Sequence, residues 1–338
     1  MENISTYRLK GGDLEMIVTN FGARVMKLYQ PDRDGNIADV VIGYNTIEEY
    51  LDNCGERFLG AVCGRFANRI AKGAFTVDGV TYSLPINNNG QTLHGGLKGV
   101  DSVVWTVVEH DDHRILFRYI SPDGEEGFPG ALSIDMSYEL TPDNEFRIEY
   151  SATTDKATPV NITHHSFFNL RGESGGTIND HVMQIFADRF VPIDEVSIPT
   201  GELKPVDGTP FDFRTPMVIG SRLGDDDQQL RMGNGYDHCY VVADGVGECK
   251  LVARVVEPES GRTMEVYTDQ PGMQFYGGNF FSGDARTKDG AAFYVPNCSF
   301  ALETQFFPDT PNQPHFPSCI LRPEETYRHQ CIYKFSAE

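Results

Sequence analysis

Hydrophobic and polar residues alternate along much of the chain, most clearly over residues 132–140. The apolar members of this run are Leu132, Ile134, Met136, Tyr138 and Leu140, with a polar residue between each pair. Strict alternation over this length indicates a strand with one buried face and one exposed face. A similar run over 146–150 follows a turn at 142–144, and the two runs predict an antiparallel hairpin.

Two further hairpins and one short helix are expected from local signals. Residues 75–77 and 80–82 flank Asp78-Gly79, a pair that readily takes the positive φ angles of a tight two-residue turn. Residues 25–29 and 38–42 flank a turn at 31–35 in the same way. Thr46 followed by Glu49 predicts a capped helix over 46–51. The acidic run at 225–227 is expected to be a solvated loop.

Glycine and proline divide these apolar runs into short segments. The chain has 34 glycines and 19 prolines, with no change in composition along its length and no fixed repeat. Many short strands separated by turn residues are typical of sandwiches and barrels. We therefore expect an all-β fold with few short helices, a large antiparallel β-sandwich forming one domain over residues 1–338.

The charge balance limits the partners that the protein can bind. Twenty-eight basic residues stand against 49 acidic residues, which gives a net charge of −21. Such a field disfavours nucleic acid and anionic membrane surfaces, and it repels phosphorylated substrates unless a local basic pocket offsets it. A neutral ligand meets no such barrier. Solubility alone is a sufficient reason for the acidity.

Cysteine usage and the N-terminal residues favour a cytoplasmic location. The seven cysteines are Cys54, Cys63, Cys239, Cys249, Cys298, Cys319 and Cys331. An odd count without a CxxC pair argues against a disulfide framework and a structural zinc site, so free thiols and no metal are expected. Residues 1–5 do not begin a signal peptide, and no apolar stretch is long enough to cross a membrane.

Two segments contain residues suited to acid–base chemistry. Glu303 is a lone carboxylate between Ala301-Leu302 and a proline-rich loop, a setting that suits a general base. His164 and His165 are adjacent in a strand-like run, so they point to opposite faces and cannot both bind one metal ion easily. From the residues alone, one buried and one exposed histidine is the simpler interpretation.

Polar residues in four other segments are candidates for ligand binding. Asn68 and Arg69 would point to opposite sides of a regular strand, so a bulge or loop is required if both reach one pocket. His94 precedes two glycines that leave room for a ligand, although a histidine bonded to the turn backbone is an equal possibility. Asp237 fits either a ligand contact or a turn aspartate, and Gln274 is a further candidate.

These segments, taken together, resemble the aldose 1-epimerase (galactose mutarotase) family. The matching motifs are R-F-A-N-R-I at 65–70, L-H-G-G at 93–96, H-S-F-F-N-L at 165–170, Y-D-H at 236–238 and L-E-T-Q at 302–305. They follow the order of the family from about residue 60 to residue 323. The resemblance implies the galactose mutarotase-like β-supersandwich, and it places His164 where the family usually has asparagine.

The resemblance also implies a reaction and a set of roles. The family interconverts the α and β anomers of free aldoses such as galactose and glucose, and it needs no cofactor. Glu303 is then the base at the anomeric hydroxyl, His165 the acid at the ring oxygen, and His94 a second donor near that oxygen. The residues implied to bind sugar hydroxyls are Asn68, Arg69, Asp237 and Gln274.

This mechanism needs an ionised Glu303 and a protonated His165. We expect neighbouring carboxylates such as Asp237 to raise the pKa of His165, and we expect a bell-shaped pH–rate profile. The expected partner is a small free aldose, and the expected assembly is a monomer or weak dimer.

Three alternatives remain open at this point. A hexose-6-phosphate 1-epimerase would need a basic cluster at the pocket. A non-catalytic carbohydrate-binding protein would need no carboxylate and histidine across the anomeric centre. A glycoside hydrolase would need two carboxylates, for which Glu303 and Asp237 are the candidates.

Overall fold

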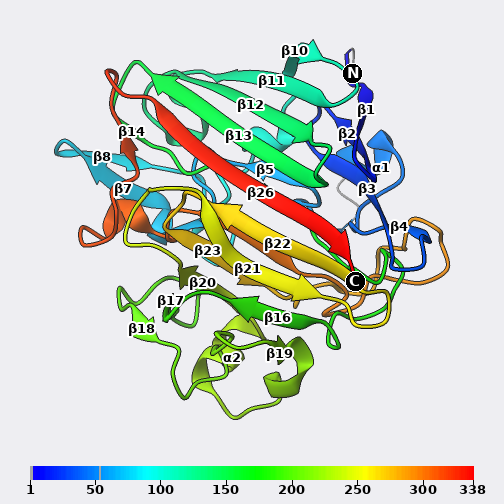
Figure 1. Cartoon of the computed structure of the whole chain (residues 1–338). Helices are drawn as coiled ribbons and strands as arrows, with labels where there is room; N and C mark the ends of the chain where they lie inside the picture. The colour runs from blue at the N-terminus through cyan, green and yellow to red at the C-terminus, as the bar shows by residue number, and fades with distance from the viewer. Residues whose placement is uncertain (1–2, 53–54) are drawn as a thin grey trace.

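Strands dominate the computed structural model, which describes residues 3–52 and 55–338 (Figure 1). The expectation of a free thiol at Cys54 lies outside the described residues. The other six cysteines are free thiols. No helix in the described part of the chain is long and apolar enough to cross a membrane.

A nine-stranded antiparallel sheet forms one side of the molecule. Its strands, in spatial order, are β10 (Thr106–His110), β11 (Arg114–Ser121), β12 (Leu132–Leu140), β13 (Glu145–Thr154), β26 (Tyr327–Ala337), β22 (Arg262–Thr268), β21 (Lys250–Val256), β16 (Val182–Ile185) and β19 (Met217–Val218). Strands β12 and β13 pair from Leu132 opposite Thr154 to Leu140 opposite Phe146. The predicted hairpin and its alternating burial are therefore confirmed.

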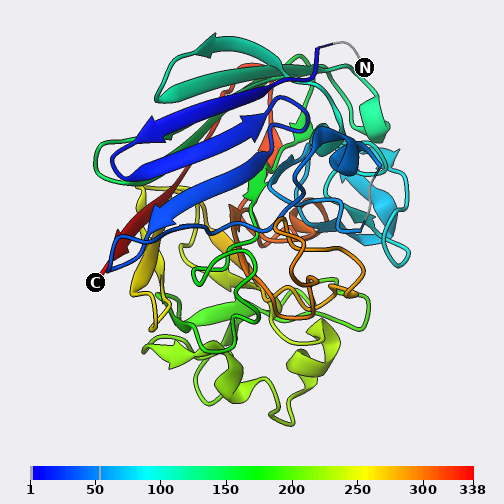
Figure 2. The same ribbon diagram turned by 90° about the vertical axis from the view of Figure 1, so that its right-hand side faces the viewer.

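Two smaller sheets supply the other strands of the core. The four-stranded sheet contains β1 (Thr6–Gly11), β2 (Leu14–Thr19), β3 (Val25–Pro31) and β4 (Ile37–Asp39), and the first three of these strands lie side by side in Figure 2. The five-stranded sheet contains β18 (Lys204–Pro205), β17 (Arg189–Val191), β20 (Asp237–Val241), β23 (Gly272–Tyr276) and β24 (Ala301–Gln305).

The remaining strands form four short pairs. These are β14 (Thr158–Pro159) with β25 (Ile320–Leu321), β15 (Thr163–His165) with β5 (Ala61–Cys63), β6 (Arg69–Ile70) with β9 (Thr92–Leu93), and β7 (Ala74–Val77) with β8 (Val80–Ser83). The β7–β8 hairpin turns at Asp78 and Gly79, whose φ angles are 52° and 80°, as the Asp-Gly pair predicted. Strands β3 and β4 also pair as predicted, although β4 ends at Asp39.

The two α-helices of the described residues are short. Helix α1 (Ile47–Leu51) begins at the predicted cap, where the Thr46 and Glu49 side chains bond each other's backbone amides. Helix α2 (Gln228–Gly233) was not predicted. The Asp227 carboxylate accepts from the amides of Gln229 and Leu230, so the end of the acidic run is a helix cap rather than only a solvated loop.

The buried core connects all three large sheets. One continuous apolar cluster includes Leu9 from the four-stranded sheet, Met136 from the nine-stranded sheet and Leu302 from the five-stranded sheet. Burial of facing apolar sides is what holds such layers together. The all-β sandwich is confirmed. One domain over 1–338 stays a prediction, consistent with a cluster that extends to Phe335.

Candidate active site

Neighbouring strands bring the polar candidates into one region. In the five-stranded sheet, Gln274 on β23 lies opposite Glu303 on β24, and Asp237 on β20 lies opposite Tyr276. Strand β15, which carries His165, is joined to β24 by a 2.8 Å bond from the Thr163 hydroxyl to the Thr304 carbonyl. Residues distant in the sequence therefore meet at these strands.

A cavity of about 290 Å³ lies at this meeting point. Six of the seven predicted site residues line it: Asn68, Arg69, His94, His165, Asp237 and Glu303. Gln274 is not among its lining residues in the described part of the chain. Its side-chain amide instead donates a 2.7 Å hydrogen bond to the Asp237 carboxylate, so it contacts the pocket through Asp237.

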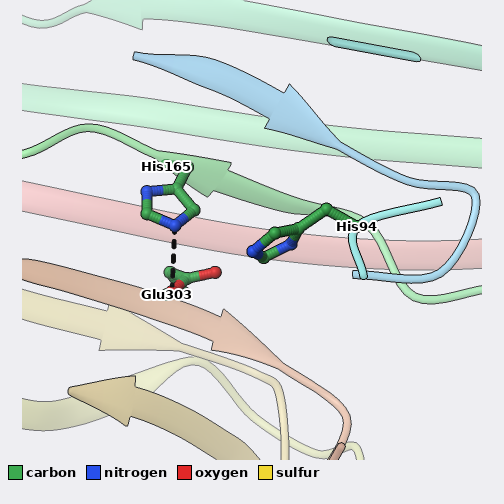
Figure 3. Close-up of side chains that lie close together, drawn as sticks. All are labelled: His94, His165 and Glu303. Carbon is green, nitrogen blue, oxygen red and sulfur yellow. Dashed lines mark ion pairs between the residues drawn. The ribbon is translucent and has the colours of Figure 1, made fainter. Parts of the chain in front are cut away.

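Glu303 and His165 face each other in the cavity (Figure 3). The Glu303 Oε1 atom lies 3.4 Å from His165 Nε2, and the two side chains are 2% and 5% exposed. The second carboxyl oxygen of Glu303 and the Nδ1 atom of His165 are buried without a hydrogen-bond partner. Unsatisfied buried polar atoms are rare in native proteins, and a bound polar ligand or water can satisfy them.

Aromatic rings hold the His165 imidazole in place. Phe167 stacks against it with ring centroids 4.6 Å apart, and Phe58 stacks at 6.1 Å. These rings fix the orientation of the imidazole and exclude water from it. No motif or periodicity in the sequence predicted Phe58 at the site.

His94 lies in a left-handed turn and exchanges two bonds with Asn68. The amide of Asn68 donates to His94 Nδ1 at 3.1 Å, and the amide of His94 donates to the Asn68 carbonyl at the same distance. A neutral imidazole that accepts at Nδ1 carries its proton on Nε2. His94 is therefore both a backbone-bonded turn histidine and a donor available to the cavity.

The backbone departs from a regular strand at Asn68, where the sequence required a bulge or loop. Asn68 has a φ of 63°, and strand β6 begins only at Arg69, so both side chains line the cavity. The Arg69 guanidinium donates from Nε to the Asn88 side chain at 3.2 Å and lies 3.9 Å from the Asp237 carboxylate. The expectation of a loop at this position is confirmed.

His164 points away from the cavity, as the alternation predicted. Its Nδ1 donates to the Tyr138 hydroxyl oxygen at 3.1 Å, since that hydroxyl gives its own proton to the Ala23 carbonyl. Its Nε2 then accepts from Ser166 at 2.6 Å. Both histidines are buried, so the simpler interpretation of one exposed histidine is wrong.

Burial in the pocket favours neutral forms of the acid–base pair. Burial lowers the pKa of His165 to about 3. Burial also raises the pKa of Glu303 well above its usual value, and the charge of Asp237 raises it further. The expectation that Asp237 raises the pKa of His165 is wrong, because loss of water around the imidazole dominates and Asp237 acts on Glu303 instead.

His94, His165 and Glu303 also lie close enough to suggest a metal site. One ligand atom from each falls within 4.8 Å of the others. A metal ion on His94 Nε2 would require the proton to move to Nδ1, where it would oppose the Asn68 amide. This tautomer argument supports the expectation of no metal, which stays a prediction.

Other residues that line the cavity were not predicted as site residues from the sequence. They include Glu56, Phe58, Asn88, Ser197, Tyr276 and Phe280. Most lie in loops, where periodicity gives no information about which side chains converge. Two of them lay in segments that the sequence had marked: Asn88 in the asparagine-rich turn before His94, and Tyr276 two residues after Gln274.

The fold and pocket define an all-β sandwich protein with a buried carboxyl–imidazole pair in a polar cavity. The aldose 1-epimerase family model matches residues 5–334. The galactose mutarotases of Bos taurus and Homo sapiens are each 45% identical over 333 residues, covering 98% of this chain and 94% of theirs. The aldose 1-epimerase of Escherichia coli is 42% identical, covering 96% of this chain and 93% of its own.

Solved structures agree with this assignment. A GalM/aldose epimerase homologue from C. elegans has a TM-score of 0.90 at 30% identity, with 99% of each chain covered. Galactose 1-epimerase from Lactobacillus acidophilus has a TM-score of 0.84 at 28% identity, covering 99% of this chain and 95% of that chain. The chain belongs to the aldose 1-epimerase family, an isomerase family, as the motifs predicted.

Proposed function

We propose that the protein is an aldose 1-epimerase that interconverts the α and β anomers of free neutral aldoses such as galactose and glucose. The observation that carries the proposal is the Glu303–His165 pair, which lies across a cavity with one unsatisfied polar atom on each partner. The full-length relatives named galactose mutarotase and aldose 1-epimerase support it.

In the proposed reaction, Glu303 takes the proton of the anomeric hydroxyl while His165 gives a proton to the ring oxygen. The ring opens to the aldehyde, the bond next to the carbonyl carbon rotates by half a turn, and closure delivers the other anomer. His94 donates from Nε2 near the ring oxygen, and Asn68, Arg69 and Asp237 bind hydroxyls. Gln274 orients Asp237 through its 2.7 Å bond.

The pair begins this reaction with one proton between its two members. Burial favours that proton on Glu303, and its transfer over 3.4 Å to His165 produces the ionised base and the charged acid together. Substrate hydroxyls entering the cavity stabilise the charged form, because hydrogen bonds to a carboxylate and an imidazolium favour their ionised states.

Charge at the pocket argues against a phosphorylated substrate. Among the described lining residues, Arg69 is the only lysine or arginine, and it faces three carboxyl groups, those of Glu56, Asp237 and Glu303. Burial also lowers the pKa of His94 well below its usual value, so this histidine adds no positive charge at neutral pH. A dianionic phosphate would meet net repulsion.

A glycoside hydrolase is also disfavoured. Asp237 accepts from Gln274 and faces Arg69, which suits a hydroxyl-binding carboxylate rather than a second free acid. The carboxyl that lacks partners, Glu303, instead faces an imidazole.

Polarimetry of freshly dissolved α-galactose and α-glucose tests the proposal. The wild-type protein should accelerate the change in optical rotation, and Glu303→Gln should lower kcat at least about a hundredfold while sugar binding persists. Glu109→Gln removes the same charge from an exposed strand and should leave the rate unchanged. Sugar binding without acceleration would instead indicate a carbohydrate-binding protein. Near-normal turnover by Glu303→Gln would exclude Glu303 as the base.

The cytoplasmic location and the monomer or weak dimer remain predictions. Cell fractionation and sedimentation of the purified protein address them separately.

A further inference from the structure

Phe58 packs against both histidines of the proposed site. Its ring centroid lies 4.6 Å from that of His94, and it stacks against His165 at 6.1 Å. The two imidazoles meet edge to face with centroids 5.2 Å apart, and Figure 3 shows both of them with Glu303. An aromatic ring from a loop therefore limits the movement of both proposed donors to the ring oxygen.

Two arginines hold the chain on either side of Phe58. The guanidinium of Arg24, a residue only 1% exposed, donates to the carbonyls of Arg57 and Leu59 at 2.8 and 3.0 Å. The Arg57 guanidinium lies over the Phe58 ring, 5.0 Å from its centroid, and a cation in this position is attracted to an aromatic face. The position of Phe58 therefore depends on basic side chains that are not among the described lining residues of the cavity.

Arg57 joins the Phe58 segment to the turn that carries His94. Its Nε and Nη2 atoms donate to the two oxygens of the Asp101 carboxylate at 2.8 and 2.9 Å, and its Nη1 atom donates to the Gly96 carbonyl at 3.0 Å. The Asp101 side chain is 0% exposed and that of Arg57 is 18% exposed. A planar guanidinium can form all of these bonds at once, whereas the compact ammonium of lysine cannot.

We propose that Arg57 is a positioning residue for the epimerase reaction, because its bonds hold Phe58 and the His94 turn in a fixed relation. This inference rests on the proposed function and adds to it a residue outside the cavity. Arg57 takes no part in proton transfer. It acts through Phe58, which keeps the imidazoles aligned with the ring oxygen, and small misalignments of such groups are costly. Loss of the bridge should therefore lower kcat more than it raises KM.

A double-mutant cycle in polarimetric rates tests this inference. Arg57→Lys keeps the charge beside Asp101 but cannot also bond the Gly96 carbonyl. It should lower kcat about tenfold and change KM by less than about twofold. Phe58→Leu should lower kcat at least as much. Because Arg57 acts through Phe58, the double variant should be no slower than Phe58→Leu, whereas independent effects would multiply.

Arg118→Lys is the matched control. Arg118 also donates from Nε and Nη2 to both oxygens of one carboxylate, that of Asp135, at 2.6 and 2.7 Å. These two side chains are 46% and 32% exposed, so the substitution should leave kcat unchanged. Asp101→Asn is the second variant, used if Arg57→Lys does not fold. It weakens the same bridge from the other side and should show the same loss of kcat and the same non-additivity.

NMR signals of the histidine ring protons report the position of Phe58 without any substrate. Phe58→Leu removes the ring current that acts on His94 and His165, and Arg57→Lys should shift the same signals in the same direction. Unchanged signals, normal kcat in Arg57→Lys or losses that multiply would each overturn the role of Arg57 and leave the epimerase proposal intact.

The same measurements separate this inference from the function on which it rests. Absence of acceleration by the wild-type protein on every aldose would overturn the epimerase proposal. The histidine signals would then still decide whether Arg57 positions the Phe58 ring: a shift in Arg57→Lys supports it, and unchanged signals overturn it.

Discussion

At the scale of single residues, desolvation rather than neighbouring charge sets the state of the candidate catalytic pair. Burial moves the pKa of Glu303 upward and that of His165 down to about 3. A simple base and acid would need the carboxyl pKa to lie below the imidazole pKa. Here the pKa of Glu303 is raised and that of His165 is lowered, so the order is reversed. The pair still holds a single proton over the whole range between them.

This reversed order predicts the pH dependence of turnover. Initial mutarotation rates should not fall near pH 6.5, the ordinary pKa of histidine. The bell-shaped profile expected from the sequence is therefore replaced by one that stays level on the acid side while the protein stays folded. The alkaline loss should follow the raised pKa of Glu303, because above it the pair has no proton left for the ring oxygen. Polarimetric rates, corrected for the uncatalysed reaction, measure the acid and alkaline sides of the profile. Circular dichroism at each pH shows whether the protein is still folded. An acid limb near pH 6.5 in folded protein would contradict this order.

At the scale of elements, the backbone conformation of the turn at Asn68 determines which groups reach the cavity. Its left-handed conformation interrupts the strand, brings Arg69 to the cavity and aims an amide at His94. The motif at 65–70 revealed which residues matter, and alternation alone revealed that a regular strand could not bring both to one pocket. Neither the motif nor the alternation could reveal the hydrogen bond from the Asn68 amide to His94, because that contact joins two separate turns.

Comparing Asn68→Gly with Asn68→Ala isolates this backbone role. Both variants lose the side chain, but glycine adopts positive φ freely whereas alanine does not. The free energy of unfolding should be about 1 kcal/mol lower for Asn68→Ala than for Asn68→Gly, measured by urea denaturation. Activity should also be lower for the alanine variant, because the His94 contact depends on the turn. Equal stability and equal activity would show that the turn conformation is unimportant.

Strands were more predictable than helices and loops for a physical reason. The β12–β13 hairpin could be predicted because one face of each strand is buried, which imposes alternation over nine and ten residues. Helix α2 is only six residues long, too short to show a helical period, and its Asp227 cap looked like part of an acidic loop. Glu56, Phe58 and Phe280 reach the cavity from loops through long-range packing, which no local pattern records.

At the scale of the whole molecule, buried histidines make the fold sensitive to acid. Six have pKa values lowered mainly by burial: His94, His164, His165, His181, His238 and His329. Each stays neutral in the folded state but binds a proton in the unfolded chain once the pH falls below 6.5. Their contribution to stability is therefore complete above pH 6.5 and is lost as the pH falls toward about 3 to 4.

The urea midpoint should decrease steeply between about pH 7 and pH 5. Each such histidine lowers the free energy of unfolding by up to about 1.4 kcal/mol per pH unit in this window. Carboxyls with raised pKa values, such as Glu303 and Asp309, act in the opposite direction and reduce the net slope. His164→Asn removes one titrating group and should make the slope shallower. A midpoint that is constant or rises toward pH 5 would contradict this prediction.

Strand β26, residues 327–337, is inserted between β13 and β22 near the middle of the nine-stranded sheet, where it pairs with both. During synthesis, about three hundred residues therefore emerge before the strand that joins the two halves of the sheet. Until then β13 and β22 each present an unpaired edge, the kind of surface that recruits other chains into aggregates. A ribosome that stalls before this segment would release a polypeptide with both edges open, so chaperone demand should be greatest late in translation.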